Sequence, residues 1–246
     1  MRRLPGPHPA KRRNPVVSRV FGPSEDGSPG PRRYDRAESR GDRTCAKWSE
    51  VGLGVAKPMR SDRWTGADLD HLPENGLHYE VLNGQLVVSA PPTTRHQVVL
   101  HGMAHALNAA LPDDDYEIGY GLGVLIGQDE PIPDLIVTAS PIDPDLSRVP
   151  AEQVVLAIEV VSESSRMADR SIKPLLYAEA GIPHYWRCEI QPVHPQLPGE
   201  LPPVVFTYVL GTDGSYQLTH RVSAGDTVTL RIPFEFCVDP AALLSV

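Results

Sequence analysis

Residues 154–161 form an almost continuous apolar run, Val-Val-Leu-Ala-Ile-Glu-Val-Val, that contains a single acid. Such a run is typical of a central strand that is covered on both of its faces. It therefore predicts a layered α/β domain. The acid, Glu159, then occupies a place where an ionised carboxylate is costly unless it is paired, hydrogen-bonded or bound to a metal ion.

Two principal helices are expected to flank the sheet that contains this strand. Apolar residues recur at helical spacing across residues 94–110 and predict the first. The second is expected over about residues 168–180, with Gly181 as the glycine that ends it. A short helix is also expected after Thr65, which has Asp68 three residues later.

The remaining strands are predicted from alternating or apolar runs between turn residues. Asn83-Gly84 separates two such runs, which is a strong hairpin signal. The predicted strands cover residues 78–82, 85–88, 116–126, 132–138, 184–188, 204–210 and 216–222. Together, these elements predict a mixed α/β fold with a central mixed sheet, two principal flanking helices and a C-terminal β-hairpin.

Charge divides the chain into two parts. Residues 1–58 hold 13 Lys and Arg against 6 Asp and Glu, a balance of +7, whereas residues 59–246 hold 10 against 25, a balance of −15. The first part also has 8 Pro and 7 Gly without apolar periodicity, so we expect it to be disordered. It is either a passive tail, a basic arm for nucleic acid, or a segment that is not translated because Met59 is the start. Residues 59–246 are expected to form the folded domain.

Several classes of protein are excluded by simple patterns. No run reaches the ~18 apolar residues of a membrane helix, and the first residues lack the apolar core of a secretory signal. Three cysteines without a CxxC pair argue against a disulfide scaffold and a zinc cluster. No helix is expected to follow Gly121-Leu122-Gly123, so no nucleotide cofactor is expected. A soluble, cytoplasmic protein that does not contact membranes is the prediction.

A second acid, Asp134, lies in a setting like that of Glu159, because Ile132-Pro133 precedes it and Leu135-Ile136-Val137 follows it. Acids that project from adjacent core strands can share a cation. Magnesium takes oxygen ligands, usually one or two carboxylates with water and phosphate oxygens. The alternative is that each acid lies at a strand end and reaches water.

The spacing of these acids resembles a known motif. Pro133-Asp134, then 24 intervening residues, then Glu159-Val160-Val161 resembles the pattern of the PD-(D/E)XK nuclease superfamily. More specifically, the chain resembles the Uma-two family of predicted restriction endonucleases from about Trp64 to Leu210. The residues that carry this resemblance are Tyr79-Glu80-Val81-Leu82-Asn83-Gly84-Gln85-Leu86-Val87, His96-Gln97, Pro133-Asp134, Glu159-Val160-Val161-Ser162, Ser165-Arg166, Asp169, Lys173, Tyr177 and Gly181-Ile182-Pro183-His184-Tyr185-Trp186.

The resemblance implies a restriction-endonuclease-like core and hydrolysis of DNA that depends on Mg²⁺ or Mn²⁺. Under it, Asp134 and Glu159 would be metal ligands and catalytic residues. Glu80, on a preceding strand, would be a third acid that binds or orients the metal. Its alternative is an exposed acid of a hairpin.

The lysine departs from the superfamily pattern. Val161 stands where the pattern has Lys, and the Uma-two resemblance points to Lys173 as the catalytic lysine. It is the only lysine beyond Met59. Pro174 disfavours helical geometry at the residue before it, so we expect the helix to begin near Lys173 and its dipole to attract phosphate. The alternative is a solvated cation.

The charge of the domain restricts how it could contact nucleic acid. Arg166 and Arg170 are expected to contact the DNA backbone, although such arginines are often only solvated. A domain with a balance of −15 binds DNA poorly unless arginines cluster, the basic arm helps, or a homodimer forms a cleft. Two alternatives follow: a nuclease-fold DNA-binding module without activity, or a metal-dependent phosphoesterase that acts on a smaller substrate.

Overall fold

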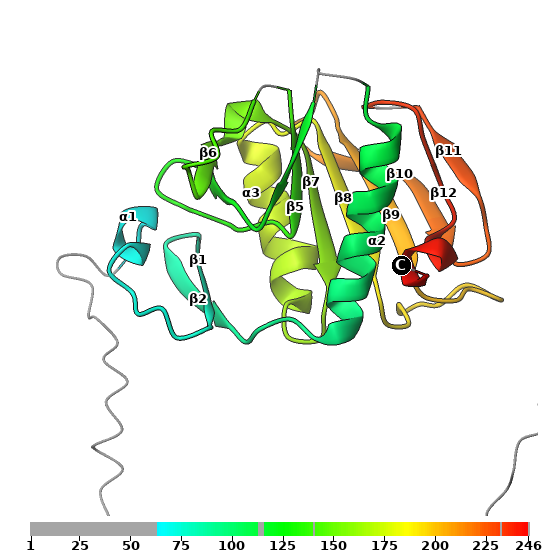
Figure 1. Cartoon of the computed structure of the whole chain (residues 1–246), viewed down its shortest axis with the longest axis horizontal. Coiled ribbons are helices and arrows are strands. Elements are labelled where there is room, and N and C mark those ends of the chain that lie inside the picture. Colours follow the sequence, from blue (N-terminus) through cyan, green and yellow to red (C-terminus); the bar gives the residue numbers. More distant parts are fainter. Residues whose placement is uncertain (1–62, 113–115, 140, 232, 246) are drawn as a thin grey trace, which may run out of the picture. The chain divides into compact units, whose positions relative to one another are not determined.

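The computed structural model describes residues 63–112, 116–139, 141–231 and 233–245 of the 246-residue chain. The predictions for residues 1–58 and for a start at Met59 lie outside these described residues. The described part has a mixed α/β architecture, as the sequence predicted (Figure 1).

A six-stranded mixed sheet lies at the centre, with the strand order β10-β9-β8-β7-β5-β3. These strands are β3 (Glu117–Tyr120), β5 (Leu135–Thr138), β7 (Val154–Val161), β8 (His184–Glu189), β9 (Val204–Leu210) and β10 (Tyr216–Ser223). β7 runs parallel to β8, and the other neighbouring pairs of this sheet are antiparallel.

Strand β7 is covered on both faces, which accounts for its apolar sequence. Leu156 and Ile158 pack into the same core cluster as residues of helix α2 (Thr94–Ala110). Ala157, which points to the other face, packs with Tyr177 of helix α3 (Lys173–Glu179). Figure 1 accordingly shows α2 and α3 on opposite sides of the sheet.

Local signals set the ends of the main elements. Helix α2 begins after Thr93, whose hydroxyl oxygen accepts a hydrogen bond from the His96 backbone N–H at 3.3 Å. Helix α3 ends at Glu179, and Gly181, the predicted terminating glycine two residues later, adopts a φ of +77° that favours glycine. Strands β1 (His78–Leu82) and β2 (Gln85–Ser89) form the predicted hairpin.

The second predicted hairpin, β9–β10, joins the central sheet because β9 pairs with β8. The prediction of one strand over residues 116–126 is wrong: Gly121, with a φ of +56°, separates β3 from a short strand β4. The remaining elements are α1 (Gly66–Leu69), β4 (Gly123–Leu125), β6 (Arg148–Pro150), β11 (Val228–Leu230), β12 (Phe236–Val238) and 3₁₀-helices at Ala151–Gln153 and Pro240–Leu244. β4 pairs with β6 in parallel, and β11 pairs with β12 in an antiparallel ribbon.

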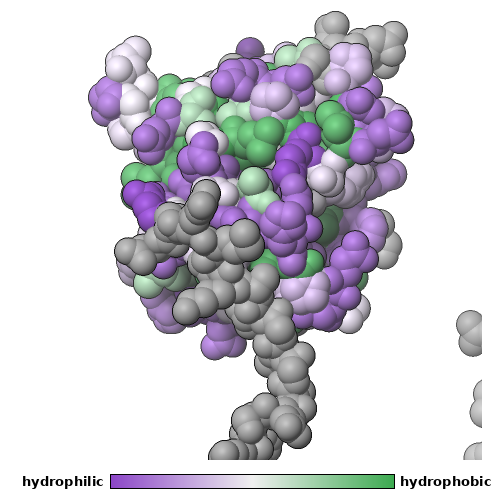
Figure 2. Space-filling model, turned by 90° about the vertical axis from the view of Figure 1, so that its left-hand side faces the viewer, coloured by the Kyte–Doolittle hydropathy of each residue, from purple (hydrophilic) through white to green (hydrophobic). Residues whose placement is uncertain are grey.

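The visible surface is mixed in character. On the side shown in Figure 2, hydrophobic residues form separate patches between hydrophilic ones. None of the described helices combines the length and the apolar character that crossing a membrane requires.

Candidate active site

Asp134 and Glu159 approach each other from neighbouring strands. Leu135 of β5 pairs with Ile158 of β7, so the antiparallel register places Asp134, just before β5, opposite Glu159. Residues that face each other in this way project to the same side of the sheet. Both line one cavity of about 350 Å³. The structure therefore brings the two predicted metal ligands to a single site.

Asp134 is held through one of its two carboxylate oxygens. Oδ2 accepts a hydrogen bond from the Val160 backbone N–H at 2.7 Å and lies 3.1 Å from Nε2 of His96. Oδ1 takes no part in either contact. Burial raises the pKa of Asp134 to about 7, against the opposing effect of Lys173. Burial also lowers the pKa of His96, with a smaller contribution from His78, so a neutral imidazole that donates from Nε2 fits this contact.

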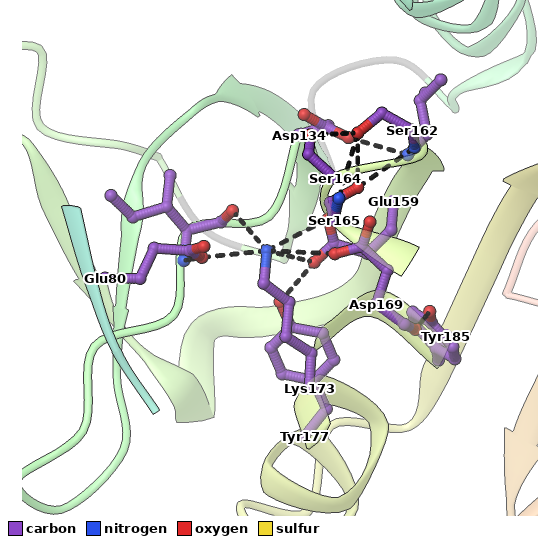
Figure 3. A network of polar contacts seen from close by, with 12 residues as sticks. Glu80, Asp134, Glu159, Ser162, Ser164, Ser165, Asp169, Lys173, Tyr177 and Tyr185 are labelled. Carbon is purple, nitrogen blue, oxygen red and sulfur yellow. Dashed lines mark hydrogen bonds and ion pairs between the residues drawn. The ribbon is translucent and has the colours of Figure 1, made fainter. Parts of the chain in front are cut away.

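Lys173 points into the middle of the carboxylates (Figure 3). Its Nζ lies 2.9 Å from Oε1 of Glu80, 3.2 Å from Oε1 of Glu159 and 3.5 Å from Oδ1 of Asp169. It also donates to the backbone carbonyl of Ile132 at 3.1 Å. The residue is only 4% exposed, so the alternative of a solvated cation is wrong.

Glu159 is buried and has a second donor. It is 1% exposed, and its Oε1 accepts a hydrogen bond from the hydroxyl of Tyr177 at 2.7 Å. Burial raises the pKa of Glu159 well above its ordinary value, although Lys173 acts in the opposite direction. Glu159 therefore does not reach water at a strand end, which was the alternative to a functional role.

Glu80 completes the cluster from strand β1. Its Oε1 accepts a hydrogen bond from the Ile132 backbone N–H at 2.6 Å and faces Lys173. The residue is 7% exposed, so the alternative of an exposed hairpin acid is wrong. The hairpin thus brings a third predicted acid to the two that come from the central sheet.

Helix α3 begins at Lys173, as predicted, but this start is not a free N-terminus, so the prediction of a helix dipole directed at phosphate is wrong. A π-helical segment, Ala168–Ile172, runs directly into α3, and Lys173 itself has helical dihedrals (φ −57°, ψ −44°). The wider turn accommodates Pro174, which cannot donate a backbone hydrogen bond. The Tyr185 hydroxyl donates to the carbonyl of Asp169, in the turn that precedes this proline.

Asp169, Tyr177 and His96 all belong to the site, although the family resemblance included them without implying a role. Asp169, Lys173 and Tyr177 follow one another at intervals of four, which places them on one side of a helix. Once one of these three residues is assigned to a site, the spacing of four predicts that the other two lie beside it. His96 had no such spacing signal, because its partner Asp134 lies 38 residues away in the sequence, and the family resemblance alone pointed to it.

The two predicted DNA-contacting arginines differ in their surroundings. Arg166 is exposed. Arg170 instead donates from Nε and Nη2 to the two carboxylate oxygens of Glu189, both at 2.7 Å. A DNA contact through Arg170 would require this bidentate ion pair to open.

The donor chemistry of the cluster suits a hard divalent cation. Four acids, Glu80, Asp134, Glu159 and Asp169, surround one ammonium group, and burial raises the pKa of the last three. Oδ1 of Asp169 is buried, accepts no hydrogen bond and has the Lys173 ammonium group 3.5 Å away. Within the described part of the chain, no three acidic, histidine or cysteine side chains have the arrangement of a metal site. The carboxyl oxygens of this cluster are instead arranged around Nζ of Lys173. The charge and the oxygen donors of these residues fit a divalent cation.

Comparison with known proteins agrees with this fold. A solved structure from Anabaena variabilis ATCC 29413, described as "a putative nuclease belonging to DUF820", superposes with a TM-score of 0.54 at 17% sequence identity. The match covers 74% of this chain and 97% of that one, and at this identity it shows the fold alone. No curated protein matches the sequence. The model of the Uma2 family, described as "Putative restriction endonuclease", matches residues 67–241, and the chain therefore belongs to that family.

Proposed function

We propose that the protein is a metal-dependent endonuclease that hydrolyses phosphodiester bonds of DNA at the carboxylate cavity. The observation that carries the proposal is a buried lysine among carboxylates, within 3.5 Å of three of them, in a cavity that Asp134 also lines. A lone ammonium group leaves a surplus of carboxyl groups there. Such a surplus is expected of a site that receives a cation.

A Mg²⁺ or Mn²⁺ ion would be held by Asp134 and Glu159, with Glu80 as the third acid, and would polarise the phosphodiester and lower the pKa of an attacking water. The chain's own residues prepare this site. His96 and the Val160 N–H fix Oδ2 of Asp134, and Tyr177 fixes Oε1 of Glu159.

Lys173 supplies the positive charge that acts on the substrate. Its Nζ reaches the cavity from α3 and is oriented by Glu80, Glu159 and the carbonyl of Ile132. A preorganised cation stabilises negative charge as it develops on the phosphate oxygens, and does so more strongly where water is excluded. Removal of one such group from an active site commonly lowers kcat by about 10²–10³.

The test is cleavage of plasmid DNA and of a single-stranded oligonucleotide with Mg²⁺ or Mn²⁺. We expect Asp134→Ala, Glu159→Ala and Lys173→Ala to lose at least about a hundredfold in rate. Asp145→Ala is the matched control, because this acid is exposed and lies outside the cavity. Equal rates for the parent and either acid variant would overturn the assignment, provided that the melting curves show folded protein.

Binding measurements separate the two rival functions. DNA binding without Mg²⁺ or Mn²⁺ binding in calorimetry would favour a module without activity. Turnover of a small phosphodiester without DNA cleavage would favour a phosphoesterase, which the acidic balance of the domain tolerates better. The homodimer and the cytoplasmic location stay predictions, the first of them open to test by light scattering.

A further inference from the structure

The cavity has an apolar part beside the acids. Pro91 and Pro92, from the segment between β2 and α2, and Leu100 of α2 line it together with Tyr120 at the end of β3. Tyr120, the last residue of the edge strand β3, is 50% exposed, so its ring is accessible to a ligand. This part of the wall has no role in holding the carboxylates or Lys173.

Tyr120 lies next to Asp134 through the sheet. It pairs with Leu135, the residue after Asp134, and the N–H of the following Gly121 donates to the Asp134 carbonyl at 3.2 Å. These pairings join the backbones, whereas the side chains share one cavity, which Tyr120, Asp134 and Glu159 all line. A nucleotide whose phosphate is bound at the acids therefore has the Tyr120 ring in the same cavity.

Positive charge in this cavity is scarce. Among its described lining residues Lys173 is the one Lys or Arg side chain, and it is already bound to carboxylates. Of the described arginines, Arg148, Arg170 and Arg221 also face carboxylates. Backbone phosphates supply most of the affinity of proteins for duplex DNA through Lys and Arg, and among the residues that line this cavity Lys173 alone could make such a contact.

Access also limits the substrate. Glu159 and Lys173 are 1% and 4% exposed, so a scissile phosphate must enter the cavity to meet them. A base-paired strand keeps its bases stacked inside the duplex, whereas an unpaired nucleotide can turn its base toward an aromatic ring. Stacking of a base on an aromatic side chain gives affinity without positive charge.

We propose that Tyr120 and the adjoining apolar wall hold an unpaired base, so that the site acts on single-stranded DNA in preference to duplex DNA. The inference rests on the proposed nuclease function and adds its substrate class. Tyr120 is assigned as a substrate-binding residue that contacts the base of the nucleotide being cut.

The test compares three substrates of equal length with Mn²⁺: an oligothymidylate, the same strand in a duplex, and a strand of abasic residues with the same phosphates. We expect the thymidylate to have the lowest KM. Tyr120→Ala should raise that KM by about 5- to 150-fold, more than it changes kcat, and bring it close to the abasic value. Tyr120→Phe keeps the ring and should retain the preference.

Leu146→Ala serves as the control, since this residue is 52% exposed and does not line the cavity. The inference is overturned if the duplex or the abasic strand is cut as readily as the thymidylate, or if Tyr120→Ala keeps the parent's preference. DNA cleavage without base dependence would leave the nuclease function intact. If nothing is cut, the nuclease function fails, and fluorescence anisotropy with Ca²⁺ still decides the inference: equal affinity for the thymidylate and the abasic strand would refute it.

Discussion

Asp134→Asn should stabilise the metal-free protein at pH 8 and should do so by less than half as much at pH 5. The carboxyl group of Asp134 has its pKa raised by burial from 3.8 to about 7. It therefore binds its proton more tightly in the folded state than in the unfolded chain. The stability that this proton contributes is fully present below pH 3.8 and is lost as the pH rises through about 7.

The size of the effect follows from that difference. About three pH units at about 1.4 kcal/mol each give roughly 4 kcal/mol as an upper value. The Asp134 side chain is 24% exposed, and solvent screening reduces this value to about 2 kcal/mol. For a domain of this size, 2 kcal/mol corresponds to about 4–8 °C in Tm.

The assay is thermal unfolding in EDTA at pH 5 and pH 8. Asparagine keeps an oxygen that can accept from the Val160 N–H and from His96, while the charge is removed. Asp226→Asn is the control, because Asp226 is exposed and lies in a turn away from the cavity. An equal gain at both pH values, or a loss at pH 8, would refute the argument that buried charge is the cause.

Three further results are expected. Addition of Mg²⁺ at pH 8, to about a hundredfold above Kd, should stabilise the parent protein by about 2.7 kcal/mol in thermal unfolding. A Tm that does not change with Mg²⁺ or Mn²⁺ would contradict metal binding. Tyr177→Phe removes the hydroxyl that donates to Glu159 and should lower the free energy of unfolding in urea by about 1.5–3 kcal/mol. An unchanged midpoint would show that this hydrogen bond does not contribute to stability. Gly102→Ala should destabilise the folded protein by about 1–3 kcal/mol, because the added Cβ would lie 2.5 Å from the Leu243 carbonyl oxygen. This cost outweighs the better helix propensity of alanine. The control Asn108→Ala, on the exposed side of α2, should be neutral or stabilising.

Elements with strong local signals were predicted well. The helix over residues 94–110 and the strand over residues 154–161 have the bounds that the sequence indicated. The turn at Asn83-Gly84 forms because both residues adopt positive φ, of +53° and +73°, as a two-residue hairpin of type I′ requires. In each case the determining residues are neighbours in the chain.

The arrangement of strands depended on distant residues and was not predicted. The order β10-β9-β8-β7-β5-β3 results from pairings between segments that can be tens of residues apart. Short strands such as β11 and β12 have three residues each, too few to show a period. The interruption at Gly121 was likewise missed, because a single glycine in an apolar run does not reveal whether the chain turns there.

The site shows the same division between local and distant information. Glu159 was found because an acid in an apolar strand is costly wherever the strand lies, and this argument needs no partner. Lys173 came from family resemblance, and its helical setting was predicted wrongly because Pro174 was read as a helix start. The π-helical segment, stabilised from β8 by Tyr185, is a tertiary feature that no local rule provides.

The position of Lys173 explains how so acidic a cluster is compatible with folding. The ammonium group lies within 3.5 Å of Glu80, Glu159 and Asp169, so it offsets part of their mutual repulsion before any metal is present. Burial alone would lower the pKa of Lys173, but these acids, Glu159 first, raise it well above its ordinary value and keep the group charged. A charge that stabilises the fold is thereby already located where a phosphate would need it. Variants of Lys173 are therefore expected to lose both stability and activity. Asp134→Asn is expected to gain stability but to lose activity, so it distinguishes the contribution of this site to catalysis from its contribution to stability.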